Sequence, residues 1–276
     1  MQPRVIGKCI YCGSEEGLTK EHIVPFGLDG TRVLLRASCG SCAAVTGAFE
    51  RDVLRESLGP ARSVMGISSR KKKNRPTHYP MRMERDGRKF IRNVPVEEYI
   101  PLLPVLHVGL PGYITEGSRH QVGDGSRDVT MVGKAMLRSE DHAERLMRKY
   151  GATKLTLKYT FYPVDFARML AKIAYCLAVE QFGLEGIADP YVVPATLGKS
   201  EDIWHFVGGD RNYPYRTNTP QKIDALLWVD MDVIGGDVMA RLGLFPHASL
   251  PVYVVVVGRA HDGLRGLFQS VGRRHS

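Results

Sequence analysis

Four of the five cysteines form two Cys-x-x-Cys pairs near the N-terminus, and this spacing constrains the fold more than any other feature of the chain. The pairs are Cys9 with Cys12 and Cys39 with Cys42. A tight turn brings both thiolates of such a pair to one ion about 2.3 Å away, and two turns complete a tetrahedral site. A metal that closes the loop of residues 13–38 contributes folding free energy directly. The spacing therefore predicts one structural Zn2+.

A pair of disulfides and a set of four free thiols are the alternatives to zinc. Residues 1–8 contain two basic residues and no hydrophobic stretch, so the sequence shows no export signal. We therefore expect a cytoplasmic protein, and disulfides are rare in the cytoplasm. A redox role for the paired thiols is a weaker interpretation, because this spacing suits a metal better. The fifth cysteine, Cys176, falls in an apolar run and is expected to be a buried, inert thiol.

The run Glu21-His22-Ile23-Val24-Pro25 lies between the two cysteine pairs. With the pairs on either side, in this order, the sequence resembles the HNH (ββα-metal) endonuclease family, in the subgroup whose core is pinned by two Cys-x-x-Cys knuckles. The resemblance is specific over about residues 6–58. Some bacterial and phage members look similar over their whole length, including a phrase like Ala171-Lys172-Ile173-Ala174.

This resemblance implies a metal-dependent endonuclease that hydrolyses phosphodiester bonds in nucleic acid, with DNA as the expected substrate. His22 would be the general base that activates water, and Glu21 would be a ligand of the catalytic Mg2+ or Mn2+. The residue types suit this chemistry, because a neutral imidazole accepts a proton near neutral pH and a carboxylate binds a hard cation. The alternative is an exposed loop pair without a role. Neighbouring side chains of a regular strand point to opposite faces, so pleating alone does not bring these two together.

The sequence departs from the family pattern at the second ligand of the catalytic ion. The family usually has Asn or His directly after the last cysteine, where this chain has Ala43. It also tends to carry an Asn several residues before the second knuckle, and residues 32–37 contain none. A helix over residues 43–57 would place Glu50 on the same face as Ala43, nearly two turns further on, so Glu50 is the candidate replacement ligand. The alternative is a solvated helix acid beside Arg51.

Positive charge is concentrated just after this segment. The formal net charge is +9, which attracts polyanions such as nucleic acid. The candidate nucleic-acid-binding residues of the connector 61–76 are Arg70, Lys71, Lys72, Lys73 and Arg75. A solvated linker is the alternative for this run. No apolar run approaches the roughly 18 residues of a membrane span, so no membrane partner is expected.

The whole pattern predicts an α+β protein in three parts. These are a zinc-pinned ββα module at residues 1–60, the basic connector, and a larger mixed α+β domain at residues 77–276. Within the larger domain, Asp86-Gly87 predicts a hairpin. Residues 163–182 predict a helix whose apolar stripe faces the core, and residues 226–234 and 252–257 predict strands, the second of them buried on both faces. Nothing in this part predicts a chemistry of its own.

Two functional interpretations follow. In the first, the protein is a metal-dependent HNH nuclease with a structural zinc. In the second, the N-terminus is a non-catalytic zinc-ribbon module that binds nucleic acid or protein. Ala43 favours the second interpretation, because alanine cannot bind the catalytic ion. The Glu-His-Ile-Val-Pro run favours the first, because a purely structural knuckle does not need it. The nuclease is the working hypothesis.

Overall fold

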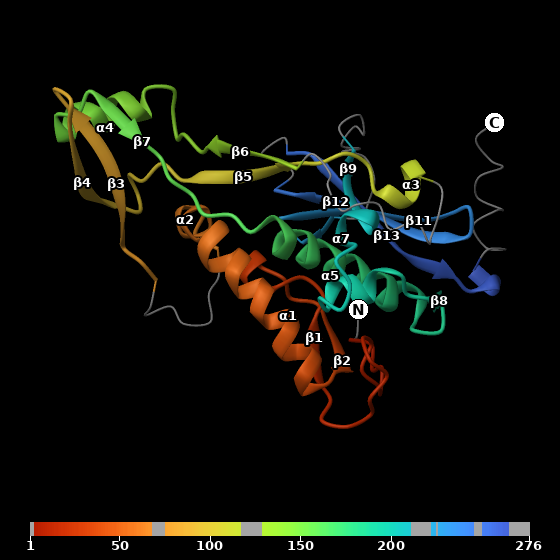
Figure 1. The fold of residues 1–276 in the computed structure, drawn as a ribbon. Helices are drawn as coiled ribbons and strands as arrows, with labels where there is room; N and C mark the ends of the chain where they lie inside the picture. The colour runs from red at the N-terminus through yellow and green to blue at the C-terminus, as the bar shows by residue number, and fades with distance from the viewer. Residues whose placement is uncertain are drawn as a thin grey trace.

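The structure of the protein is a computed structural model. It describes residues 3–67, 75–116, 129–210, 222–224, 226–245 and 250–264. These residues form a mixed α+β fold of helices and antiparallel sheets, which confirms the predicted α+β class (Figure 1).

The N-terminal segment folds as a β-hairpin followed by a helical run (Figure 1). Its elements are β1 (Thr19–His22), the short 3-10 helix η1 (Phe26–Leu28), β2 (Val33–Ser38), α1 (Gly40–Asp52), the π-helical turn η2 (Val53–Ser57) and α2 (Gly59–Val64). Strands β1 and β2 pair antiparallel, with Glu21 opposite Leu34 and His22 opposite Val33. The order of elements is therefore strand, strand, helix.

Helix α1 begins earlier than the sequence predicts. The expected helix over residues 43–57 instead starts at Gly40, because Cys39 is its N-cap residue, in extended backbone with ψ 163°. The second cysteine pair thus spans the N-cap and the first turn of α1, and a ligand bound by the cysteines would be attached directly to the helix. After α1, the π-helical turn η2 leads into α2, with only Leu58 between them.

The largest sheet is antiparallel throughout. In spatial order its strands are β10 (Lys222–Asp224), β11 (Leu227–Ile234), β12 (Asp237–Leu244), β13 (Val252–Ala260) and β8 (Ile187–Asp189), with β9 (Val207–Asp210) also paired to β13. The strands predicted at residues 226–234 and 252–257 are both present. Strand β13 is buried along its length except at half-exposed Arg259, as expected for a strand covered on both faces.

The described residues also form two smaller sheets. The first is β4 (Arg88–Pro95), β3 (His78–Arg85) and β7 (Lys154–Thr156); the second is β5 (Leu102–His107) with β6 (Thr130–Ala135). The predicted hairpin joins β3 to β4 through Asp86 and Gly87, which both have positive φ, as a tight hairpin turn requires. The remaining helices are α3 (Gly112–Glu116), α4 (His142–Tyr150), α5 (Pro163–Phe182), α6 (Val192–Thr196) and α7 (Ile203–Phe206).

Helix α5 connects the N-terminal segment to the large sheet. It packs against α1 on one side and against β12 and β13 on another (Figure 1). One cluster of buried apolar side chains accordingly runs from Cys9 to Ala260, while a second, smaller cluster lies under the β3–β4–β7 sheet. The packing joins parts that the sequence analysis assigns to separate domains. The boundaries at residues 60 and 77 stay a prediction.

The side of α5 that meets the N-terminal segment is polar. Tyr175 donates a hydrogen bond from its hydroxyl to the carbonyl oxygen of Ile10, at 2.6 Å. Cys176 is fully buried, as predicted, with its Sγ 3.6 Å from the Tyr11 hydroxyl. Burial raises the pKa of the Cys176 thiol to about 12, which keeps it protonated and inert. One helical turn further on, Glu180 forms an ion pair with Arg32.

Tyr175→Phe tests whether this polar side stabilises the fold. The substitution leaves the buried Ile10 carbonyl without its donor, so we expect the free energy of unfolding to fall by about 1–3 kcal/mol. Urea unfolding followed by circular dichroism measures the change. The matched control is Tyr162→Phe, because Tyr162 is 41% exposed, and it should change stability by less than about 0.5 kcal/mol. Equal stability of the two variants would contradict the assigned role of Tyr175.

Candidate functional site

The four paired cysteines form the first candidate site. Their Sγ atoms all lie within 4.8 Å of one another, and those of Cys12 and Cys39 are 3.6 Å apart. A tetrahedral zinc with bonds of about 2.3 Å places its sulfur ligands about 3.8 Å apart. All of the cysteines are free thiols in the structure, so the disulfide alternative is not supported. The cysteines are therefore positioned to bind a metal ion, in agreement with the predicted structural zinc.

Local turns produce this arrangement. The amide of Gly13 donates to the carbonyl of Cys9 at 2.8 Å, and Gly13 has φ +77°, so the first pair sits on a tight turn that favours glycine. The second pair uses the start of α1, where Ala43 donates its amide to the Cys39 carbonyl. The hydroxyl of Ser41, 3.2 Å from Sγ, and the Cys42 amide lower the pKa of the Cys39 thiol to about 6. A lowered pKa favours the thiolate, which is the form that binds metal.

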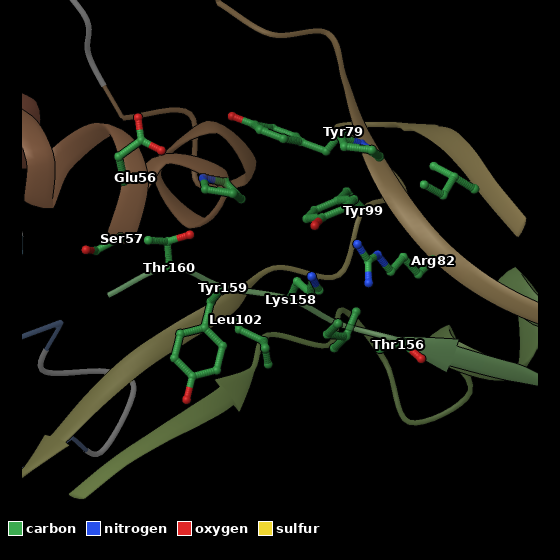
Figure 2. Close-up of a pocket in the computed structure, with 14 residues that line it drawn as sticks. Glu56, Ser57, Tyr79, Arg82, Tyr99, Leu102, Thr156, Lys158, Tyr159 and Thr160 are labelled. Carbon is green, nitrogen blue, oxygen red and sulfur yellow. The ribbon is translucent and has the colours of Figure 1, made fainter. Parts of the chain in front are cut away.

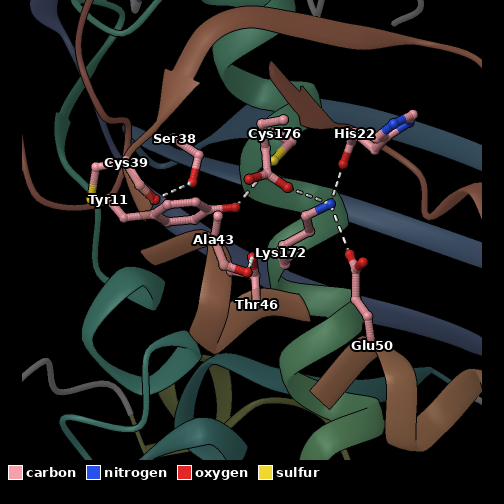
Figure 3. A network of polar contacts seen from close by, with 10 residues as sticks. Tyr11, His22, Ser38, Cys39, Ala43, Thr46, Glu50, Lys172 and Cys176 are labelled. Carbon is pink, nitrogen blue, oxygen red and sulfur yellow. Dashed lines mark hydrogen bonds and ion pairs between the residues drawn. The ribbon is translucent and has the colours of Figure 1, made fainter. Parts of the chain in front are cut away.

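The second candidate site is a buried ion cluster around Lys172. The ammonium Nζ of Lys172, on α5, is 2.9 Å from an oxygen of Glu21 on β1 and 2.9 Å from an oxygen of Glu50 on α1. It also donates a hydrogen bond to the backbone carbonyl of His22 (Figure 3). The Lys172 side chain has no exposed surface, while the side chains of Glu21 and Glu50 are 7% and 18% exposed. One cation thus joins the strand and the helix of the N-terminal segment to α5.

Lys172 is charged in this cluster. Burial alone is the largest single effect and lowers the pKa of the ammonium, because a low-dielectric environment disfavours charge. The carboxylates of Glu50 and Glu21 together outweigh that effect, and the pKa of Lys172 is raised above its ordinary value. The group therefore stays protonated at any physiological pH. Two carboxylates facing one ammonium leave a formal excess of one negative charge.

The structure places the predicted catalytic residues in two groups. Glu21 and Glu50 come together on a single cation, and that cation is an ammonium. His22 contributes its backbone carbonyl to the same cation, but its imidazole points away from the Lys172 ammonium (Figure 3). This divergence follows from strand geometry, because consecutive side chains of β1 lie on opposite faces. The assignment of Glu21 and Glu50 as metal ligands and of His22 as a base stays a prediction.

The sequence analysis gave Lys172 no role. The position of Lys172 could have revealed its importance. Helix α5 is buried continuously from Phe166 to Val179 apart from Arg168, and Lys172 is a fully buried charge inside that stretch. A fully buried lysine is rare unless it is paired, so a lysine in the middle of an apolar helix predicts a buried acidic partner. The sequence alone does not say which acid that partner is.

The predicted nucleic-acid-binding residues are only partly placed. Arg70, Lys71, Lys72 and Lys73 lie outside the described residues. Arg75 is described, and its guanidinium donates to the carbonyl of Ile67 at 2.7 Å, so Arg75 contacts the part of the connector that follows α2. Its role in binding phosphate stays a prediction, as do the roles of the four others.

Comparisons with known proteins add no family to this description. No protein-family model matches the chain, and no curated protein or solved structure matches it significantly. None of the helices in the described part of the chain combines the length and apolar character needed to cross a membrane. The functional argument therefore depends on the residues and their geometry.

Cys39→Ser tests the zinc site. The variant loses one of four ligands and the thiol with the lowered pKa, so we expect the zinc content of the purified protein to fall from one ion per chain towards zero, with loss of stability. Elemental analysis of protein purified without chelator measures this. Cys176→Ser is the matched control and should keep one zinc, because Cys176 lies outside the cluster. Wild-type protein without zinc would refute the site.

Lys172→Met tests the ion cluster. Methionine has a similar length but leaves two buried carboxylates facing each other without a cation, so we expect unfolding free energy to fall by about 3–5 kcal/mol. Mn2+ should raise the melting temperature of this variant more than that of the wild type, because the ion can take the vacated position between Glu21 and Glu50.

Two controls make this test specific. Lys154→Met, at an exposed position of β7, should leave stability almost unchanged. The triple variant Glu21→Gln, Glu50→Gln, Lys172→Met removes the charges together and should regain much of the lost stability without any response to Mn2+. A single Lys172→Met variant as stable as the wild type would show that the cluster contributes little.

Proposed function

We propose that the protein hydrolyses phosphodiester bonds in nucleic acid, with DNA as the expected substrate, and that residues 19–52 form its catalytic segment. The observation that carries this proposal is the meeting of two carboxylates on one cation beside His22, one carboxylate coming from a strand and one from the following helix. The strand–strand–helix order supports the same assignment, as do the four clustered cysteines, two of them before the segment and two at the start of α1. Zinc would hold the segment and take no part in the reaction.

His22 is the proposed general base. It is the last residue of β1, and its carbonyl is bound by Lys172, so the backbone that carries the imidazole is anchored to α5. A neutral imidazole would accept the proton of the attacking water as the water oxygen bonds to phosphorus and the bond to the leaving oxygen breaks. Positioned proton transfer of this kind contributes about 10²- to 10⁴-fold to a rate.

Glu21 and Glu50 are the proposed ligands of a catalytic Mg2+ or Mn2+. Carboxylate and carbonyl oxygens are the donors that these hard cations prefer, and the cluster offers two carboxylates and the carbonyl of His22. A divalent ion held there would stabilise the charge that develops on the scissile phosphate. The same oxygens bind the Lys172 ammonium, so the ion and Lys172 compete for one position. Use of a divalent ion at this place requires Lys172 to withdraw.

The Lys172 contact also favours a second candidate function. If Lys172 stays between the carboxylates, Glu21 and Glu50 are structural, and Ala43 supplies no ligand to replace them. The protein would then be a non-catalytic zinc-ribbon module that uses its positive charge to bind nucleic acid. The two functions differ in a measurable way, because only the first converts bound nucleic acid into product.

His22→Ala separates these functions. If His22 is the base, the variant should cleave plasmid or oligonucleotide DNA at least about 100-fold more slowly in Mg2+ or Mn2+, while zinc content and melting temperature stay as in the wild type. Gel assays of supercoiled plasmid measure cleavage, and fluorescence anisotropy in EDTA measures binding. Binding should be unaffected, because the substitution removes a proton acceptor and no positive charge.

His78→Ala is the matched control, because His78 is an exposed histidine on β3, away from the catalytic segment. It should cleave like the wild type. If the wild-type protein binds DNA and RNA but cleaves neither with any divalent ion, the nuclease proposal is contradicted and the non-catalytic binding module is favoured. If the His22→Ala variant still cleaves, the protein is a nuclease but His22 is not its general base.

A further inference from the structure

A pocket of about 620 Å³ lies beside η2 and α2 (Figure 2). Its walls come from η2 and α2, from the stretch that runs from β3 to the start of β5, and from the end of β7 with the segment after it, all within the described residues. Its volume is in the range of pockets that bind small molecules, which is about 300–1,000 Å³. Neither the ion cluster nor the cysteines line it, so it is a separate site.

Aromatic rings form two sides of this pocket. Tyr79 and Tyr99 lie together, with ring centroids 5.1 Å apart, and the ring of Tyr159 is on the other side (Figure 2). Tyr159 is 40% exposed, so a ligand has access to its ring. Aromatic faces in an open, partly polar pocket are suited to stack on a nucleobase, and such stacking accepts any base because every base has a π-face.

Two cationic side chains line the same pocket. Arg82 comes from β3 and Lys158 from the segment after β7, and both are exposed. Within the described part of the chain, no hydrogen bond or ion pair engages either of them. Arg85, three residues further along β3, differs, because it donates to the carbonyls of Tyr150 and Gly151 and so stabilises the fold. Arg82 and Lys158 are therefore available for an anionic ligand, and a guanidinium matches a phosphate in particular.

We propose that this pocket binds one nucleotide unit of single-stranded nucleic acid, with the base against the exposed ring of Tyr159 and the phosphate at Arg82 and Lys158. The hydroxyls of Thr156 and Thr160 and the carboxylate of Glu56 add the hydrogen-bonding groups that a base edge requires. A base inside a duplex presents no free face to such a ring, so an unpaired strand fits the pocket better than a duplex does.

The pocket and the ion cluster share the helical run that contains α1 and η2. Glu50 and Glu56 lie on the same helical run, and six residues at about 1.5 Å each separate them by about 9 Å along its axis. The proposal concerns binding alone and does not depend on cleavage at His22.

The test is the affinity of the full-length protein for a fluorescent single-stranded oligonucleotide, measured by anisotropy in EDTA so that no cleavage occurs. Tyr159→Ala should weaken binding by about 5- to 150-fold, the effect of losing one base–aromatic stack. Arg82→Gln and Lys158→Gln should each reduce the slope of log affinity against log salt by about 0.7, the effect of one lost phosphate contact on a single strand.

Matched controls lie outside the pocket on the same surface elements. Tyr162→Ala removes an exposed ring, and Arg92→Gln removes an exposed charge of β4, and both variants should bind like the wild type. An oligonucleotide without bases should bind the wild type and Tyr159→Ala equally, because it has nothing to stack. The proposal would be overturned if the pocket variants bound the oligonucleotide as tightly as the control variants do. It would also be overturned if Tyr159→Ala weakened binding of the oligonucleotide without bases. A failure of cleavage by the wild type would leave it unaffected.

Discussion

The contact on which the structure most depends is the buried Lys172 ammonium between Glu21 and Glu50. It joins β1, α1 and α5 at one point, and it also binds the carbonyl of His22. Breaking such a pair leaves a buried charge uncompensated, which typically costs 3–5 kcal/mol. Replacing a whole buried ion cluster by apolar side chains is nevertheless often neutral or stabilising. Stability alone therefore does not explain why this chain keeps two acids and a lysine in its core, and this supports a functional use of the cluster.

The cysteine cluster and the ion cluster hold opposite ends of the same small segment. A metal on the four cysteines would fix the start of α1 to the loop before β1, because Cys39 is the N-cap residue of that helix. Lys172 fixes the end of β1 to the second half of α1, and Tyr175 and Glu180 continue the contact along α5. The polar contacts of α5 add to the apolar side chains that this segment itself buries, among them Ile23, Leu34 and Phe49. These apolar residues belong to the same buried cluster as those of the large sheet, although sequence patterns assign the two to separate parts.

The features that the sequence predicted well are those set by local spacing. The Cys-x-x-Cys pairs, the Asp86-Gly87 hairpin, helix α5 and strand β13 each depend on residues close together in the chain, and all are present. Helix periodicity made Glu50 a candidate ligand by placing it on the face of Ala43. It predicted neither the meeting of Glu50 with Glu21 nor the cation between them, because Lys172 is distant in sequence and its partners are decided by tertiary packing. The pocket was not predicted either, since its walls come from three separate stretches of chain. The start of α1 was placed late because a cysteine is an unusual N-cap residue.

The central claim is that Lys172 is the cation held by Glu21 and Glu50 when no nucleic acid is bound. Anomalous diffraction from crystals of the wild-type protein soaked in Mn2+ tests it most directly. We expect clear density for the Lys172 side chain with its Nζ about 3 Å from both carboxylates, and no anomalous peak for Mn2+ between them. A Mn2+ peak between Glu21 and Glu50, with the Lys172 side chain turned away, would contradict the claim.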